Sequence, residues 1–191
     1  LHPRVACLLN VTPDHVEWHG SIEAYAAAKE KVFQNLDAGD LAIVSEEDSW
    51  CQAVISRLEA RGLRVCHLNV HAQPQAPCAA FVRDGRLVVR LDGKEHDLMA
   101  TTEVPIAGDH NLQNIMGAYK VCLQLGISPE QFFSSISKFK GAANRLQKIA
   151  ETDNAVAFKD FAHSPSKLKA TVHAVKSQFP DRKLVACMEL H

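Results

Sequence analysis

The stretch of the chain richest in side chains able to do chemistry is 10–29, "NVTPDHVEWHGSIEAYAAAK". It contains the pair Asp14-His15, and a second histidine, His19, follows four residues after His15. Carboxylate and imidazole groups are suitable ligands for Mg²⁺, Mn²⁺ or Zn²⁺. A capped turn in which His19 stacks on Trp18 would use the same residues without a metal. The spacing alone leaves both interpretations open.

Lys29 ends this stretch, on a segment with helical spacing. A lysine on a helix is usually a solvated surface residue, because its ammonium is costly to bury. Its place after the Asp-His turn nevertheless makes it a candidate for the same site.

A second polar cluster, "GDHNLQN" at 108–114, opens a predicted helix. Asn111 and Asn114 are three residues apart and therefore lie on one helix face. Each amide offers a donor and an acceptor, which matches the edge of a purine. Ordinary helix capping by Asp109 or Asn111 is compatible with the same pattern.

A third cluster, "KDFAHSPSKL" at 159–168, lies between a predicted strand and a predicted helix. Asp160 ends the strand and could present its carboxylate to a ribose or an amine. The helix N-terminus, together with Lys167, favours an anion. A plain Ser-Pro helix start is the alternative.

The elements around these clusters predict a parallel sheet. Buried strands are expected at 5–11, 41–45 and 63–68, with helices at 21–36 and 47–62 between them. Strands separated by helices pair in parallel, and ligands bind beyond the carboxyl ends of such strands. The polar clusters lie at positions of this kind.

The pattern changes near Lys140 and Gly141, where we place a domain boundary. The elements predicted after residue 70 are a hairpin meander at 79–98, a further strand at 103–108, helices at 109–126 and 128–139, strands at 146–150 and 155–161, a helix at 164–179 and a strand at 183–188. The expected fold class is therefore α/β, with one domain at 1–140 and another beginning at 141–191.

Composition excludes several classes of protein. Hydrophobic residues make up 47% of the 191 residues and the formal net charge is -1, so neither disorder nor nucleic-acid or membrane recruitment is expected. The six cysteines lack CxxC spacing, which predicts free thiols, a cytoplasmic protein and no zinc or disulfide framework. We expect a monomer.

The chain begins without Met and ends beside a predicted strand, so we expect an internal piece of a longer protein.

The three clusters, in this order, resemble the Mur ligase family, the ATP-dependent enzymes that add amino acids or peptides to UDP-N-acetylmuramic acid. The resemblance implies that 1–140 are the C-terminal portion of a central ATPase-type domain and that 141–191 start a Rossmann-like C-terminal domain. Residues 1–36 resemble the D-glutamate-adding branch. The stretches "GAANRLQKI" and "KDFAHSPSKL" resemble more closely the branches that add alanine or a tripeptide.

The resemblance also implies roles for single residues. His15 would bind Mg²⁺, and Lys29 would be carbamylated, which replaces its cation with an anionic oxygen ligand for the same ion. Asp14 and His19 would support them. The residues implied for ATP are His110, Asn111, Asn114 and Arg145 for the adenine and Asp160 for the ribose, with His163 and Lys167 in the substrate and phosphate region.

The implied reaction is phosphorylation of a substrate carboxylate by ATP, followed by attack of an amine on the acyl phosphate. The substrates would be a UDP-N-acetylmuramoyl compound and an amino acid or peptide. No GxxxxGK[ST] loop occurs in the 191 residues. In the family this loop and the UDP-binding domain precede the first strand, so the chain by itself is expected to be inactive.

Two other enzyme classes remain as alternatives. A folylpolyglutamate synthase-like ligase shares the architecture and the amide-forming chemistry, but the wording "HGSIEAYAAAK" favours the muramyl branch. A zinc-dependent hydrolase could use Asp14, His15 and His19, although no HExxH element accompanies them. A non-catalytic interaction module would need a large exposed apolar pattern, which the sequence does not contain.

Overall fold

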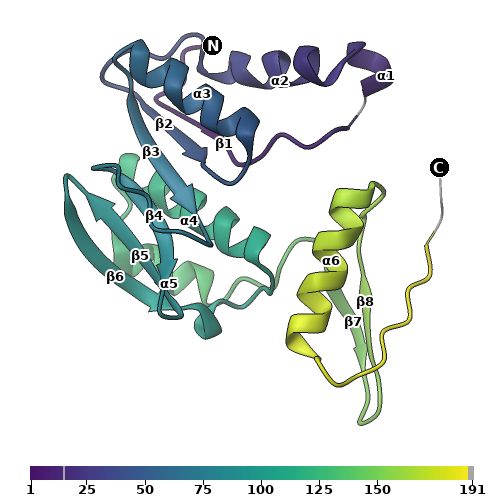
Figure 1. Ribbon diagram of the computed structural model, residues 1–191. Helices are drawn as coiled ribbons and strands as arrows, with labels where there is room; N and C mark the ends of the chain where they lie inside the picture. The colour runs from purple at the N-terminus through teal and green to yellow at the C-terminus, as the bar shows by residue number, and fades with distance from the viewer. Residues whose placement is uncertain (15, 189–191) are drawn as a thin grey trace.

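A six-stranded sheet forms the larger part of the molecule in the computed structural model, which describes residues 1–14 and 16–188 (Figure 1). The first four strands run parallel, and the last three form an antiparallel meander. In their order across the sheet the strands are β1 (Val5–Leu8), β2 (Leu41–Ser45), β3 (Arg64–Asn69), β4 (Ala79–Arg83), β5 (Arg86–Leu91) and β6 (Lys94–Ala100). The predicted α/β class and the parallel pairing are confirmed.

Helices cover both faces of the parallel sheet. Successive side chains of a strand point to opposite faces, so neighbouring residues pack against different helices. In β2, Ala42 and Val44 pack with one cluster, whereas Leu41 and Ile43 pack with another. The first cluster includes residues of α2 (Ile22–Glu30) and α3 (Ser49–Ala60). The second includes residues of α4 (Asp109–Gln124) and α5 (Pro129–Ile136). Burial on both faces explains why the strands appear as continuous apolar runs.

The helix ends follow the predicted caps. Ser21 accepts a hydrogen bond from the Ala24 N–H at the start of α2, and Ser128 begins α5 with Pro129 in its first turn. The hairpin turns predicted at Asp84-Gly85 and Asp92-Gly93 have positive φ at all four residues, as type I′ turns require.

Three predicted elements differ from the structure. The strand expected at 103–108 is wrong: the chain forms the 3-10 turn η2 (Thr101–Glu103) and then a loop, where Pro105 has no N–H to donate to a ladder. The helix expected at 21–36 ends at Glu30 and continues as the 3-10 turn η1 (Lys31–Phe33). The strand expected at 183–188 is also wrong, because this segment pairs with no strand among the residues that the structure describes. The short helix α1 (Val16–His19) was not predicted.

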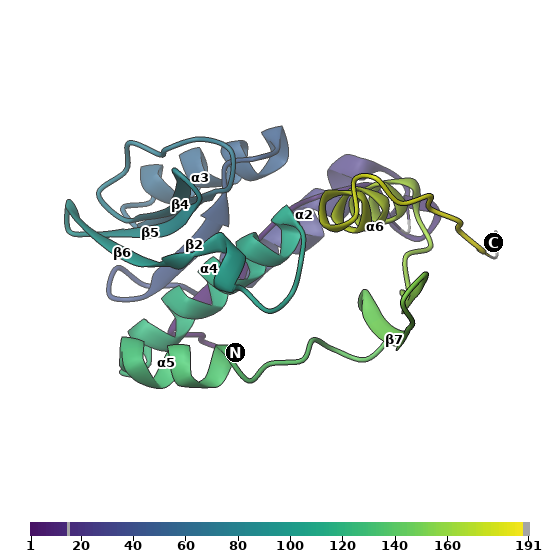
Figure 2. The ribbon, with the colours of Figure 1, turned by 90° about the horizontal axis from the view of Figure 1, so that it is seen from below.

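A smaller unit follows the sheet. It consists of the hairpin β7 (Gln147–Glu151) and β8 (Val156–Lys159), followed by α6 (Pro165–Gln178). Figure 2 shows the connecting segment, residues 137–146, running from α5 to β7. Within the described residues, no helix combines the length and the apolar character needed to cross a membrane.

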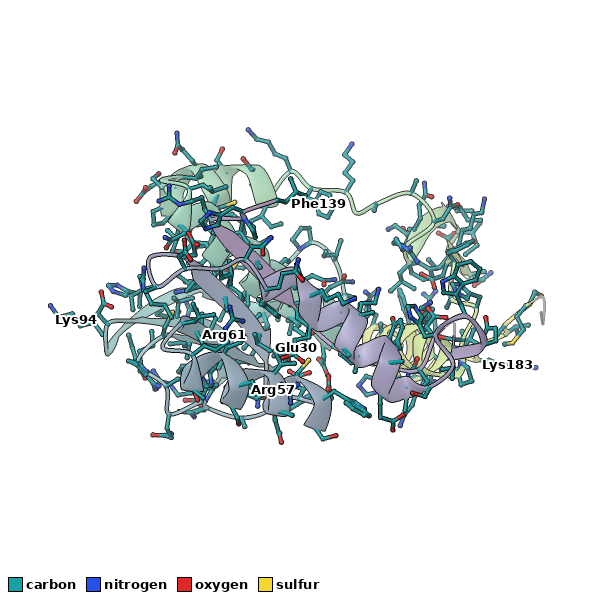
Figure 3. The ribbon with its side chains drawn as sticks, turned by 90° about the horizontal axis from the view of Figure 1, so that it is seen from above. Glu30, Arg57, Arg61, Lys94, Phe139 and Lys183 are labelled. Carbon is teal, nitrogen blue, oxygen red and sulfur yellow. The ribbon has the colours of Figure 1, made fainter. Side chains whose placement is uncertain are left out.

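An arginine fork joins α2 to α3 (Figure 3). Arg57 donates from Nε and Nη2 to the two carboxylate oxygens of Glu30, at 2.8 and 2.6 Å. Arg61, one turn later, donates to the carbonyl oxygens of Phe33 and Gln34. These contacts fix the end of α2, on which Lys29 lies.

Replacing Arg57 with lysine is expected to lower the free energy of unfolding by about 0.5 to 1 kcal/mol, because lysine cannot make two parallel hydrogen bonds and the pair is partly exposed. Chemical denaturation of Arg57→Lys, Glu30→Gln and the double variant measures the coupling between the two side chains. A coupling energy near zero would contradict the fork's contribution to stability.

Candidate functional site

A cleft of about 650 Å³ lies between the start of α4, the connecting segment and α6. Residues of the loop after β1 also line it, including Asn10 and Thr12. The site residues expected from the sequence that line this cleft are His110, Asn111, Asn114, Arg145, Asp160 and Lys167. Residues from three separate stretches of the chain therefore share one cavity.

The two asparagines lie in the first turns of α4, three residues apart as expected. Asn114 Nδ2 donates to Asn111 Oδ1 over 3.3 Å, and Asn111 Nδ2 donates to the carbonyl oxygen of Ala107 over 2.7 Å. Within the described chain, no hydrogen bond is made by the Asn114 side-chain oxygen. Asn111 thus orients Asn114, whose side-chain oxygen can still accept a hydrogen bond from a ligand.

Asp160 organises the loop that carries Arg145. Its Oδ2 accepts the N–H of Leu146 at 2.6 Å, and its Oδ1 accepts the N–H of Ala162 at 2.8 Å and the hydroxyl of Thr171 at 3.0 Å. Leu146 has φ 44, which is uncommon for a residue other than glycine. The carboxylate holds this conformation and retains lone pairs for a further donor.

Arg145 extends from that loop and stacks on Phe161. The guanidinium carbon lies 5.4 Å from the ring centroid, a distance typical of a cation-π contact. The Arg145 side chain remains exposed at the cleft. A planar cation placed in this way can stack on a second flat group.

His110 lies where the start of α4 approaches α6. Partial burial lowers the pKa of His110 below the ordinary histidine value, although Asp160 and Asp109 oppose this shift. A Cβ on Gly108 would come within 2.8 Å of the His110 ring and of the Ala174 side chain on α6. The glycine therefore allows the two helices to meet at the cleft.

Lys167 connects α6 to the loop after β1, which reaches the start of α6 in Figure 1. Its Nζ donates to Asp14 Oδ2 at 2.7 Å and lies 3.0 Å from His163 Nε2. His163 Nδ1 lies 2.9 Å from the carbonyl oxygen of Phe161. Because Nδ1 must donate there, the neutral ring leaves Nε2 to accept from Lys167. His163 is thus placed beside the cleft through Lys167.

Substituting Lys167 with methionine is expected to cost about 1 kcal/mol of stability, because the ion pair with Asp14 is partly buried and joins segments far apart in the chain. The loss should shrink at high salt. Urea denaturation at two ionic strengths measures both effects. Lys169→Met, on the exposed side of the same helix, is the matched control. Equal losses in the two variants would contradict a stabilising ion pair.

The two metal ligands expected from the sequence, His15 and Lys29, stay a prediction. His15 lies outside the described residues. Lys29 is exposed, outside the cleft, with Nζ 5.0 Å from the centroid of the Tyr25 ring. His19 packs edge-on against the same ring at 5.2 Å, whereas Trp18 is 85% exposed. His19 thus contacts Tyr25, whereas the alternative interpretation of this turn had it stacked on Trp18.

Among the described residues, one group of histidine and aspartate ligand atoms gathers within 4.8 Å: His2, Asp37 and Asp40. Asp40 directly precedes β2, at the end of the strand opposite the cleft, and Arg4 lies 3.5 Å from it. These residues form a structural ion cluster: the His2 ring and the Asp37 N–H both bond to Asp40.

A partly buried polar network beside the cleft was not predicted from the sequence. Gln113 Nε2 donates to Ser45 Oγ at 2.9 Å and to Glu47 Oε2 at 3.0 Å, while Glu47 Oε1 accepts the Val70 N–H at 2.6 Å. The network ties α4 to the carboxyl ends of β2 and β3. The signal was present, since "SEED" at 45–48 follows a strand as the three recognised clusters do.

Comparison with known protein families identifies the family of this chain. The model of the Mur ligase middle domain matches residues 1–122. This chain belongs to the Mur ligase family. The match covers the six-stranded sheet and most of α4, including Asn111 and Asn114.

Relatives extend the likeness beyond the middle domain. The chain is 30% identical over 175 residues to UDP-N-acetylmuramoylalanine--D-glutamate ligase of Koribacter versatilis, and 31% identical over 181 residues to the enzyme of that name from Brucella abortus. These alignments cover 92% and 94% of this chain but 37% of each relative. The chain thus spans little more than a third of the length of these Mur ligases.

Solved structures share the fold. MurF from Acinetobacter baumannii matches with a TM-score of 0.68 and 21% identity, covering 91% of this chain and 37% of the other. The apo form of L. casei FPGS matches with a TM-score of 0.66 and 20% identity, covering 94% and 43%. The mainly parallel sheet with its following smaller unit is thus an architecture found in solved Mur ligase structures.

Proposed function

We propose that this chain provides the adenosine-binding part of an ATP-dependent carbon-nitrogen ligase of peptidoglycan precursor metabolism. The observation that carries the proposal is the convergence of Asn111, Asn114, Arg145 and Asp160 on one cleft. Amides can bind the edge of the base, a planar cation can stack on its face, and a carboxylate can accept a ribose hydroxyl. The volume also falls within the range of small-molecule sites.

The residues of the cleft suggest a division of roles. Asn114, oriented by Asn111, would pair with the edge of the adenine, and Arg145 would stack on its face. Asp160 would accept a ribose hydroxyl with the lone pairs that its three protein donors leave. Lys167 would exchange Asp14 for a phosphate or substrate carboxylate when one is bound.

The proposed substrates are a UDP-N-acetylmuramoyl compound and D-glutamate. Both relatives at 30% and 31% identity are named as D-glutamate ligases, which supports this branch along most of the chain. ATP would supply the phosphoryl group that activates the substrate carboxylate for attack by an amine. We also propose a cytoplasmic, monomeric protein that needs neither nucleic acid nor membrane.

The proposed magnesium ligands are His15 and Lys29. As an ammonium over the Tyr25 ring, Lys29 would repel a divalent cation; only its carbamate would offer the oxygen ligands that Mg²⁺ prefers. The exposed position of Lys29 leaves its amine open to carbon dioxide. A single described ligand does not define a coordination site, so the adenosine half carries the proposal.

The proposed domain boundary at Lys140 and Gly141 lies in the connecting segment. Gly141 has φ 84, and Phe139 lies on the same segment, 41% exposed, at the cleft (Figure 3). Residues 1–140 would form the C-terminal portion of the central domain and 141–191 the start of the next. The adenosine site would thus lie between two domains.

Nucleoside selectivity tests the proposal. Saturation-transfer NMR on the 191-residue chain should detect adenosine binding, with guanosine at least fivefold weaker, because the amide of Asn114 is set for an adenine edge. Asn114→Ala should weaken adenosine binding about tenfold, the loss of roughly 1.4 kcal/mol. Asn154→Ala, in the exposed β7–β8 turn, is the control. Equal affinity for both nucleosides would refute the proposed role.

A further inference from the structure

Two cysteines lie side by side on neighbouring parallel strands. Cys66 is in β3, and the register that pairs His67 with Ala79 places Cys66 beside Cys78, just before β4. The His67 N–H donates to the carbonyl oxygen of Cys78 over 3.0 Å, so this pairing extends to Cys78. The two side chains therefore lie next to each other on the same face of the sheet.

A buried lysine completes the group. Lys120, on α4, is 2% exposed, and its positive charge favours the thiolate form of both cysteines. No carboxylate among the described residues pairs with it. A buried ammonium requires an anionic partner, because an isolated charge is costly away from water. A thiolate of one of the two neighbouring cysteines can serve as this anionic partner of Lys120.

The two thiols differ in charge and in access. The hydrogen bond from Cys66, aided by Lys120 and Arg64, lowers the pKa of Cys78 to about 6 despite burial. Burial raises the pKa of Cys66 well above the ordinary value, and the neighbouring Cys78 adds to this. Cys66 is fully buried, whereas Cys78 is partly exposed. A reagent from solvent therefore meets the thiolate first.

We propose that Cys78 is a peroxide-reactive cysteine and that Cys66 resolves its oxidised form as a disulfide between β3 and β4. The sulfur of Cys78 attacks one oxygen of the peroxide, the O–O bond breaks, and water or an alcohol leaves. Cys66 then loses its proton and attacks the sulfenic sulfur. The S–S bond forms, the S–O bond breaks, and hydroxide leaves with that proton as water. Two thiols are oxidised and one peroxide is reduced.

The backbone geometry permits this bridge. Residues paired on neighbouring strands have Cα atoms about 4.8 Å apart, within the 4.4 to 6.8 Å that a disulfide spans. Both side chains face the core beneath α4, so they point the same way. The inference concerns this cluster alone and does not depend on nucleotide binding.

Alkylation by iodoacetamide tests the thiolate. Between pH 8.5 and 6.5 the rate at Cys78, followed by mass spectrometry, should fall less than twofold. A short unstructured peptide with one cysteine, of pKa about 8.5, should slow about fiftyfold. Lys120→Met should move the Cys78 profile towards that of the peptide. A wild-type profile that follows the peptide would overturn the proposal whether or not the variant folds.

Hydrogen peroxide tests the second step. The tryptic peptide 65–83 contains both cysteines, so the disulfide appears as the loss of two hydrogens, reversed by dithiothreitol. In Cys66→Ala, Cys78 should instead be trapped by dimedone as a sulfenic acid. The exposed Cys187 is the internal control. A wild-type chain in which Cys187 oxidises first, or in which no disulfide forms within 65–83, would refute the pairing.

Discussion

Replacing Gly108 with alanine is expected to lower the free energy of unfolding by about 3 kcal/mol, the sum of backbone strain and overpacking. Gly108 has φ 98 and ψ 147, a region that side-chain-bearing residues rarely occupy. The new methyl group would also meet the Ala174 Cβ and the His110 ring at 2.8 Å. Thermal and urea denaturation measure the loss.

A matched glycine separates these two causes. Gly126 follows α4 and has φ 82, but a Cβ there meets nothing within 4 Å. Gly126→Ala should therefore cost only about 1 kcal/mol, the backbone part alone. Gly108→Ala should in addition weaken adenosine binding, because His110 and Asn111 begin the same helix. Equal losses of stability in the two variants would contradict a close contact between α4 and α6.

Replacing Asp160 with alanine should cost about 3 kcal/mol, because three hydrogen bonds to a carboxylate are lost together. The donors are the N–H groups of Leu146 and Ala162 and the hydroxyl of Thr171. The Arg145 loop should lose its fixed conformation, since Leu146 then has no partner that supports its positive φ. Adenosine affinity should fall at least tenfold. Denaturation and NMR titration measure the two effects.

Two variants serve as controls for Asp160. Asp160→Asn keeps one acceptor oxygen and should lose about half as much stability. Asp153→Ala removes an exposed carboxylate in the turn of the same hairpin and should leave adenosine binding unchanged. If Asp160→Ala bound adenosine as well as the wild-type chain, the result would contradict both the proposed ribose contact of Asp160 and the proposed role of the Arg145 loop in binding.

Much of the fold follows from local patterns in the sequence. The apolar runs at β2 and β3 show burial on both faces, and Ser21 and Ser128 show where helices begin. The strand expected at 183–188 failed because a strand is defined by its partner, and no hydrogen-bonding partner can be inferred from one segment's β propensity. The strand prediction at 103–108 was wrong because the meander ends at β6 and because Pro105 has no N–H with which to extend the hydrogen-bond ladder.

The site was predictable only in part. Asn111 and Asn114 share a helix face, so their grouping follows from spacing alone. The pairing of Asp14 with Lys167 joins residues 153 positions apart, which no local pattern encodes. Lys120 appears as one more helix lysine in the sequence, and only the packing of α4 on β3 and β4 reveals its cysteine partners. Contacts between distant segments thus account for most of what was missed.

We propose that residues from both sides of the cleft bind one adenosine. A ¹H-¹⁵N correlation spectrum of the 191-residue chain, recorded during an adenosine titration, tests it most directly. We expect the Asn111 and Asn114 side-chain amides, the Leu146 and Ala162 backbone amides and the Arg145 Nε–H to shift together with one dissociation constant. Shifts confined to one side of the cleft, or the absence of any shift at saturating adenosine, would contradict it.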